Sequence, residues 1–395
     1  MSVTFAKGFK ATGLAAGLKP SGSKDLALVV ADPVPGQARA AAVFTTNRFA
    51  AAPVELCRRH LAQAAKGGPT PVAVVLNSGG ANACTGQPGL ADAETTASQA
   101  AAALGLSPAK VLVASTGLIG QRLDMASLLR GLSAGIGQLD DSAEAGLAAA
   151  EAIMTTDTVP KQAQCEHDGW RIGGMAKGAG MLAPELATML VVITTDAVID
   201  QATAKQALKQ ACRYSFDRTD SDGCMSTNDV VFLLSSGRSG LAANTEKFTA
   251  GLTKVCQDLA LQLVDDAEGA DHVIEIVVEQ ATSETGALAV ARAVARSNLF
   301  KTAIAGRDPN WGRILSAAGT VSPEVAPFDP AQVDVAVNGI WVCRGGGVGD
   351  SRELVDLSGR QVKVEIDLKA GQEAATVLTN DLTHEYIHIN ADYST

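Results

Sequence analysis

Aromatic residues are scarce in this sequence, where tryptophan, tyrosine and phenylalanine make up only 4% of 395 residues. The interior must therefore be built from aliphatic and small side chains, which are plentiful because 47% of the residues are hydrophobic. A chain of this length and composition can bury a large core, and the length alone suggests two or three domains.

Closely spaced cysteines are also missing. The seven cysteines are scattered, and no two of them form a Cys-x-x-Cys pair. Disulfide frameworks and zinc clusters need tighter spacing than this. We therefore expect reduced thiols, a cytoplasmic location and no bound metal.

A basic surplus and a long apolar run are both absent. The 32 Lys and Arg residues are outnumbered by 42 Asp and Glu residues, for a net charge of −10. This balance argues against a nucleic-acid or anionic-membrane partner. No apolar run reaches the ~18 residues that a transmembrane helix needs. Lysines interrupt the first 24 residues, so no signal peptide is expected either.

The sequence does contain a regular alternation of short apolar runs and helix-like stretches. This pattern predicts an α/β protein with mixed α+β layers. In the first half, strands are expected at residues 27–32, 41–47, 72–80 and 110–117, and helices at residues 92–105, 124–132 and 141–154.

The second half continues the alternation and then changes character. From about residue 330 the chain becomes strand-rich, and no internal repeat or long linker separates free domains. Before that point, strands are expected at residues 189–199 and 272–280, and helices at residues 203–212, 244–264 and 284–297.

Two short patterns match binding motifs but lack the required context. HEYIH at residues 384–388 has the His-Glu-x-x-His spacing of zinc proteases, which requires a helix. The tyrosine and isoleucines in and after it favour a strand instead. Gly178, Gly180 and Ala183, with Asp200 further on, match a dinucleotide fingerprint, which requires a helix to begin there. A proline and a buried strand follow, so a dinucleotide site is the weaker interpretation.

The stretch KGAGMLAPELATMLVV, residues 177–192, places Thr188 between a glycine-rich loop and a buried apolar run. A hydroxyl is a poor nucleophile until a base removes its proton. Cleavage between Ala187 and Thr188 would create an α-amine on Thr188 itself, with an unperturbed pKa of about 7.7–8.0 that suits a general base. The residues alone leave a second interpretation open, in which Thr188 is an ordinary β-branched strand residue.

The same stretch resembles the cleavage-site motif of the ornithine acetyltransferase (ArgJ) family, whose bifunctional members are also called glutamate N-acetyltransferase/amino-acid acetyltransferase. Further blocks resemble this family in the family's order and cover essentially the whole chain. Gly80 departs from the pattern, where asparagine is expected, without touching the expected chemistry. The matching blocks are NSGGANACTG (77–86), STGLIG (115–120), MTTDTVPK (154–161), STNDVV (226–231), DDAEGA (265–270), KTAIAGRDPNWGRI (301–314) and the terminal INADYST.

The resemblance implies a self-cleaving fold of the N-terminal-nucleophile type, with helices packed on β-sheets. The chain would cleave itself between Ala187 and Thr188 into an α segment (1–187) and a β segment (188–395) that stay intertwined. Thr188 would carry the acetyl group as an ester. Thr116 and Gly117 match the family's oxyanion hole, which stabilises the charge that builds on the acetyl oxygen.

The resemblance also implies a set of substrate contacts. Lys177 would meet the carboxylate of N-acetylornithine, and Glu268 would meet its side-chain ammonium. Because the last residue is included, the C-terminus is expected to be ordered, although termini usually fray. The contacts map onto Thr155, Lys177, Thr188, Glu268, Asn390 and Thr395.

The implied activity is transfer of an acetyl group from N2-acetylornithine to glutamate in arginine biosynthesis, by glutamate N-acetyltransferase. One amide replaces another, so no cofactor is expected, and an acyl-enzyme predicts ping-pong kinetics. The resemblance leaves open whether acetyl-CoA also serves as donor, as in amino-acid N-acetyltransferase. An α2β2 heterotetramer is expected. Two alternatives stand beside this reading: an N-terminal-nucleophile amidase or aminopeptidase, and a non-catalytic dinucleotide-binding α/β protein.

Overall fold

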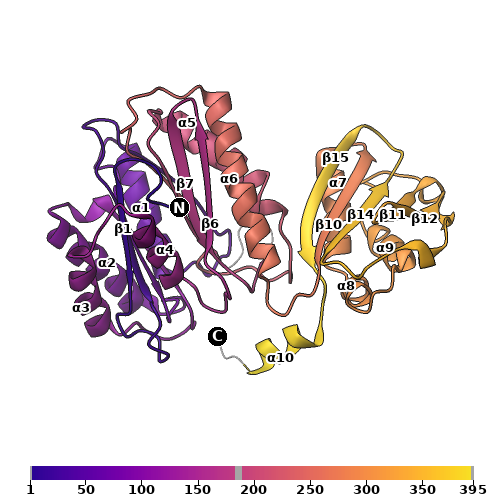
Figure 1. Cartoon of the computed structure of the whole chain (residues 1–395), viewed down its shortest axis with the longest axis horizontal. Coiled ribbons are helices and arrows are strands. Elements are labelled where there is room, and N and C mark those ends of the chain that lie inside the picture. Colours follow the sequence, from indigo (N-terminus) through magenta and orange to yellow (C-terminus); the bar gives the residue numbers. More distant parts are fainter. Residues whose placement is uncertain (1, 183–188, 393–395) are drawn as a thin grey trace.

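The computed structural model describes residues 2–182 and 189–392, and within these residues the strands form three β-sheets covered by helices (Figure 1). The expected α/β class with mixed layers is therefore confirmed. The first two sheets share one lobe, and the third sheet forms a second lobe, drawn at the right in Figure 1.

The first sheet contains, in spatial order, β1 (Phe9–Leu14), β2 (Leu26–Ala31), β4 (Ala73–Ser78) and β5 (Val111–Thr116). Only β4 and β5 run parallel in this sheet. One face packs against α1 (Ala52–Ala65), α2 (Gly86–Leu104) and α3 (Met125–Ile136). A fourth helix, α4 (Ala143–Ala152), packs against β1 and β2.

The second sheet contains β3 (Arg39–Phe44), β9 (Val230–Ser235), β8 (Leu190–Thr195), β7 (Trp170–Lys177) and β6 (Lys161–His167). β7 and β8 are antiparallel neighbours, with Lys177 opposite Leu190. Strands from both sides of residues 183–188 therefore belong to one sheet. Its outer face is covered by α5 (Gln201–Arg213) and α6 (Thr245–Asp265).

The two sheets stack on each other, and the alternation of β8 shows how. Leu190 and Val192 join the cluster between the two sheets, whereas Val191 and Ile193 join the cluster under α5 and α6. Successive strand residues point to opposite faces, and every residue of β8 is buried. The first lobe is thus a four-layer arrangement of helices, sheet, sheet and helices.

The third sheet contains β13 (Gly347–Val348), β12 (Ile340–Arg344), β11 (Asp334–Val337), β14 (Gln361–Asp367), β10 (Val273–Ala281) and β15 (Glu373–Asn380). Its apolar face packs against α7 (Glu284–Ala295), α8 (Asn298–Ala305) and α9 (Trp311–Ala318). Short 3₁₀ helices lie at Pro108–Lys110, Phe216–Arg218, Pro330–Gln332 and Arg352–Leu354.

Where a polar cap marks a helix, its start follows the sequence closely. The helix expected at 92–105 has no side-chain cap and begins earlier, at Gly86 of α2. The helix expected at 141–154 is α4, and the hydroxyl of Ser142 accepts the N–H of Ala145 at its start. The strand expected at 189–199 is shorter, since it ends at Thr195. Asp196 then turns the chain by accepting backbone N–H groups from the neighbouring segments.

The strand expected at HEYIH is wrong, because these residues begin the helix α10 (His384–Asp392). The hydroxyl of Thr383 accepts the N–H of Tyr386, which caps the first turn. Gly269 lies so close that a Cβ there would be 2.3 Å from the Tyr386 nitrogen. A cap and tertiary packing thus override a local β preference. Within the described ranges, no helix combines the length and hydropathy that crossing a bilayer requires.

Candidate active site

The end of β5 forms one wall of the candidate site. Thr116 is its last residue and is buried, and Gly117 follows with φ +127°. A Cβ on Gly117 would lie 2.6 Å from the Gly80 nitrogen and 2.7 Å from the Gly79 carbonyl carbon. Both the positive φ and this close approach require glycine. Backbone packing therefore shapes the turn and keeps the hydroxyl of Thr116 and the N–H of Gly117 in fixed places.

Lys177, the last residue of β7, lies against that wall. Its side chain is 1% exposed, and its Nζ donates a hydrogen bond to Oγ1 of Thr116 over 3.3 Å. Burial lowers the pKa of Lys177, while the charge of Asp157 acts in the opposite direction. The structure thus brings together two predicted site residues that are 61 positions apart in the chain.

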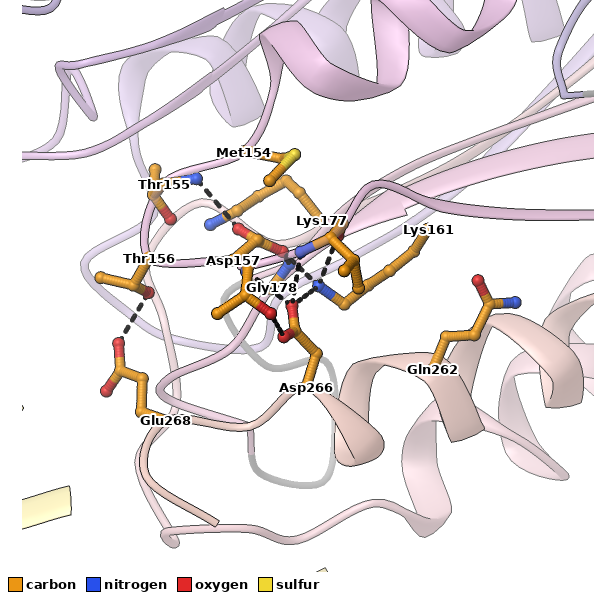
Figure 2. A network of polar contacts seen from close by, with 12 residues as sticks. Met154, Thr155, Thr156, Asp157, Lys161, Lys177, Gly178, Gln262, Asp266 and Glu268 are labelled. Atoms are coloured by element: carbon orange, nitrogen blue, oxygen red, sulfur yellow. Dashed lines mark hydrogen bonds and ion pairs between the residues drawn. The ribbon is translucent and has the colours of Figure 1, made fainter. Parts of the chain in front are cut away.

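Asp157 organises the turn that carries Thr155 (Figure 2). Its carboxylate accepts the backbone N–H groups of Thr155 (2.9 Å) and Gly178 (2.6 Å), and also contacts Nζ of Lys161 (2.7 Å). Burial acts to raise the pKa of Asp157, but Lys177 and Lys161 outweigh it and hold the pKa at about 2. Asp157 was not among the predicted site residues, although it lies within the quoted block MTTDTVPK.

Lys161 links this turn to the end of α6. Its fully buried ammonium lies 2.5 Å from Oδ2 of Asp266 and 2.7 Å from Oδ1 of Asp157. The N–H of Thr158 also donates to Asp266, over 3.0 Å. Figure 2 shows these contacts converging beside Lys177 and Gly178. A network of charges therefore joins residues that precede 183–188 with residues that follow them.

Glu268 is held by groups from three parts of the chain. Oε1 accepts the hydroxyl of Thr156 (2.7 Å) and Oε2 accepts the side-chain amide of Asn390 (2.9 Å). A Cβ on Gly180 would lie 2.6 Å from Oε2. The glycine pattern that matched a dinucleotide fingerprint therefore faces a carboxylate, which would repel a pyrophosphate. No helix begins at residues 178–182.

Asp229 is a site residue that the sequence reasoning missed. It is fully buried, and its Oδ1 accepts the N–H of Met189, the residue that follows Thr188 (3.0 Å). Burial raises its pKa well above the usual range, although hydrogen bonds from Met189 and Ser226 act against this. The available signal was the block STNDVV, in which an acidic residue stands directly before the buried strand β9.

The predicted residues fall into two groups. Thr116, Gly117, Thr155, Lys177, Glu268 and Asn390 are described, and hydrogen bonds join Thr116 to Lys177 and Glu268 to Asn390. Ala187, Thr188 and Thr395 lie outside the described residues, so their predicted roles stay predictions. In α10 the helical spacing does bring His384 and His388 to one face. In the part of the chain that the structure describes, however, no group of three metal-ligating side chains could hold a metal.

These features define an α/β protein whose candidate site combines a buried ammonium, a hydroxyl beside a strained glycine turn, and carboxylates, which are the groups that acyl transfer uses. The model of the ArgJ family matches residues 10–395, so the chain belongs to the ArgJ family.

Two relatives that carry the family's name match this chain over its full length. Arginine biosynthesis bifunctional protein ArgJ of Streptomyces coelicolor is 54% identical over 395 residues, covering 100% of both chains. The protein of the same name from Bifidobacterium longum is 53% identical over 397 residues, again covering 100% of both. A solved structure of ornithine acetyltransferase complexed with ornithine, from Mycobacterium tuberculosis, is 47% identical. The match covers 48% of this chain and 96% of that chain, with a TM-score of 0.44.

Proposed function

We propose that this chain is an acetyltransferase of arginine biosynthesis that cleaves itself before Thr188 and moves an acetyl group from N2-acetylornithine to glutamate. The name of its relatives, arginine biosynthesis bifunctional protein ArgJ, supports the pathway. The observation that carries the site assignment is the hydrogen bond from Nζ of Lys177 to Oγ1 of Thr116.

That hydrogen bond has a direct chemical consequence. Because the Thr116 oxygen accepts a hydrogen bond from Lys177, its own hydroxyl proton is free to point at a developing oxyanion. The ammonium also polarises the hydroxyl and makes it a stronger donor. With the N–H of Gly117, it would stabilise the tetrahedral intermediate formed on the acetyl group.

The reaction proceeds in two half-reactions. The hydroxyl of Thr188 attacks the acetyl carbonyl of N2-acetylornithine, its proton passes through the α-amine to the leaving nitrogen, and ornithine departs. The amine of glutamate then attacks the acetyl ester, Thr188 recovers its proton, and N-acetylglutamate leaves. One amide replaces another, so the transfer requires no cofactor. Acetyl-CoA is a second acetyl donor to test, since its thioester would form the same ester.

The surroundings of residues 183–188 support cleavage without separation of the products. On the near side, Met181 has φ +53°, which is uncommon for a long side chain, and Asp222 holds its N–H over 2.7 Å. On the far side, Asp229 holds the N–H of Met189. After cleavage, the pairing of β7 with β8 and the contacts of Lys161 would keep both segments together.

Mass spectrometry of the purified protein tests the proposal. We expect two chains, the second beginning at Thr188, and an acetyl adduct on that second chain after incubation with N2-acetylornithine. Thr188→Ala should remain a single inactive chain. An uncut wild-type protein with full activity would contradict the mechanism. Release of free acetate without any need for glutamate would indicate an amidase instead.

The finer assignments follow from the same proposal. The protein acts on small molecules, and its two segments would assemble as an α2β2 heterotetramer in the cytoplasm. Light scattering of the cleaved protein would give about twice the mass of one full-length chain, which is 40.3 kDa.

A further inference from the structure

Two pockets flank the turn at residues 154–160, and Thr158 lines both of them. Thr156 lines a pocket of about 340 Å³, which we call the acidic pocket. Thr155 lines another, of about 500 Å³, which we call the basic pocket after Lys19 and Lys24. The acidic pocket is lined by the carboxylates of Asp265, Asp266, Glu268, Asp271 and Glu385, with Arg360 as its cation.

The lining of the basic pocket carries two lysines, Lys19 and Lys24, and two carboxylates, Glu151 and Asp157. Glu151 lies 2.5 Å from Nζ of Lys24, and Asp157 lies 2.7 Å from Nζ of Lys161, which is outside the lining. The remaining charged group of the lining is Lys19, which has no carboxylate within salt-bridge distance among the residues that the structure describes. The basic pocket therefore presents one cation without an ionic partner.

The ammonium of Lys19 is held in place by backbone carbonyls. Its Nζ donates to the carbonyl oxygens of Met154 (2.6 Å) and Lys24 (3.0 Å). An ammonium carries three N–H groups, so one donor is left for a ligand. Burial lowers the pKa of Lys19, while Asp25 acts in the opposite direction. A partly dehydrated cation of this kind gains from an anionic partner.

The loop that carries Lys19 is rigid and adjoins the oxyanion turn. The buried carboxylate of Asp25 accepts four successive backbone N–H groups, those of residues 16–19, over 2.6–3.1 Å. A Cβ on Gly79 would lie 2.9 Å from the Leu18 carbonyl oxygen. Gly79 in turn contacts Gly117. The loop that carries Lys19 thus packs on Gly79, and Gly79 packs on the Gly117 turn that would stabilise the tetrahedral intermediate.

The proposed function, on which this inference rests, poses a problem of charge. Donor and acceptor share their α-amino-acid part, but the side chain of ornithine ends in an ammonium and that of glutamate in a carboxylate. A single side-chain subsite cannot complement both charges. The acidic pocket, with Glu268, suits the ammonium. We propose that Lys19 in the basic pocket binds the side-chain carboxylate of the acceptor, so that each substrate has its own side-chain subsite.

The test compares glutamate with its neutral isostere glutamine as acceptors. In Lys19→Gln, kcat/KM for glutamate should fall about 10- to 100-fold, as expected for loss of a charged hydrogen bond. With glutamine, kcat/KM should change less than about threefold, because the side chain of glutamine has no carboxylate for Lys19 to bind. Formation of the acetyl-enzyme from N2-acetylornithine, followed as ornithine release, should also change little.

Two further variants separate charge from structure. Lys19→Arg should keep most of the preference for glutamate over glutamine. Lys10→Gln, which removes an exposed charge from β1, should leave both acceptors unaffected. Equal losses with glutamate, glutamine and N2-acetylornithine in Lys19→Gln would overturn the proposal and make Lys19 a purely structural residue. A wild-type protein that forms no acetyl-enzyme would instead refute the proposed function.

Discussion

Lys161 and Lys177 stand at nearly facing positions of neighbouring strands, since Lys161 pairs with Ala176 in the register of β6 and β7. Both side chains are almost completely buried, at 0% and 1% exposure. Lys161 lies within 2.7 Å of two carboxylates. Lys177 has no ion pair within salt-bridge distance in the described ranges, and its hydrogen bond goes to the Thr116 hydroxyl. The same residue type, equally buried, thus has different partners.

The contrast shows that a buried charge can contribute either to stability or to chemistry, depending on its partners. A buried ammonium with two carboxylates holds the elements that supply them, here the 154–160 turn and the end of α6. A buried ammonium without a direct ionic partner keeps its field available for a reacting group. Lys161 therefore joins parts of the chain on both sides of residues 183–188. Under the proposed function, Lys177 would act on Thr116, the hydroxyl that would stabilise the developing charge.

The largest expected effect is on stability, at Lys161. Lys161→Met leaves Asp157 and Asp266 buried without their cation, and such a loss typically costs about 3–5 kcal/mol. Urea denaturation measures the change. Lys363→Met is the matched control, because its pair with Glu365 is partly exposed and should contribute less than about 1 kcal/mol. Equal losses in both variants would contradict the role assigned to Lys161.

The next effect is on catalysis, at Lys177. Lys177→Met removes the donor that polarises Thr116, so we expect kcat to fall about 10²- to 10³-fold, the typical cost of a lost oxyanion donor. The melting temperature should change much less than in Lys161→Met, since no directly bonded carboxylate loses its partner. Steady-state kinetics and calorimetry on the same samples test this contrast. Activity of Lys177→Met within tenfold of wild type would show that Lys177 has no important role in the reaction.

The smallest effect is the dependence of stability on pH, at Asp157. Its folded-state pKa of about 2 lies below its ordinary value, so the ionised carboxylate stabilises the fold above about pH 4. This contribution, about 2 kcal/mol, is lost as the pH falls through about 2. The stability difference between wild type and Asp157→Asn should therefore be greatest at pH 6 and shrink toward pH 2. A constant difference would mean that Asp157 acts through packing alone.

Several parts of the fold could be predicted from the sequence because their causes are local. Ser142 caps α4, because its hydroxyl accepts the N–H of Ala145, only three positions further along the chain. The apolar run that begins at Met189 predicted β8, because a strand covered on both faces carries apolar side chains on both. The neighbouring strand β9 was not predicted. The candidate site was predicted through family blocks, which placed Thr116, Lys177 and Glu268 in one region.

Other features depend on contacts between distant residues, which no local pattern contains. HEYIH has a β-like composition, yet Thr383 and Gly269 make it helical. Asp229 is a site residue only because β8 and β9 are neighbours.

The alternating elements, the polar caps and the family likeness can all be read from residue order alone, because they depend on short stretches of sequence or on direct similarity. Only the tertiary structure determines which buried lysine forms direct ion pairs and which does not. It also places Thr155 and Thr156, adjacent in the chain, in the linings of different pockets. The physical reason is that burial and charge pairing are set by neighbours in space, and Lys161 meets Asp266 across 105 positions of sequence.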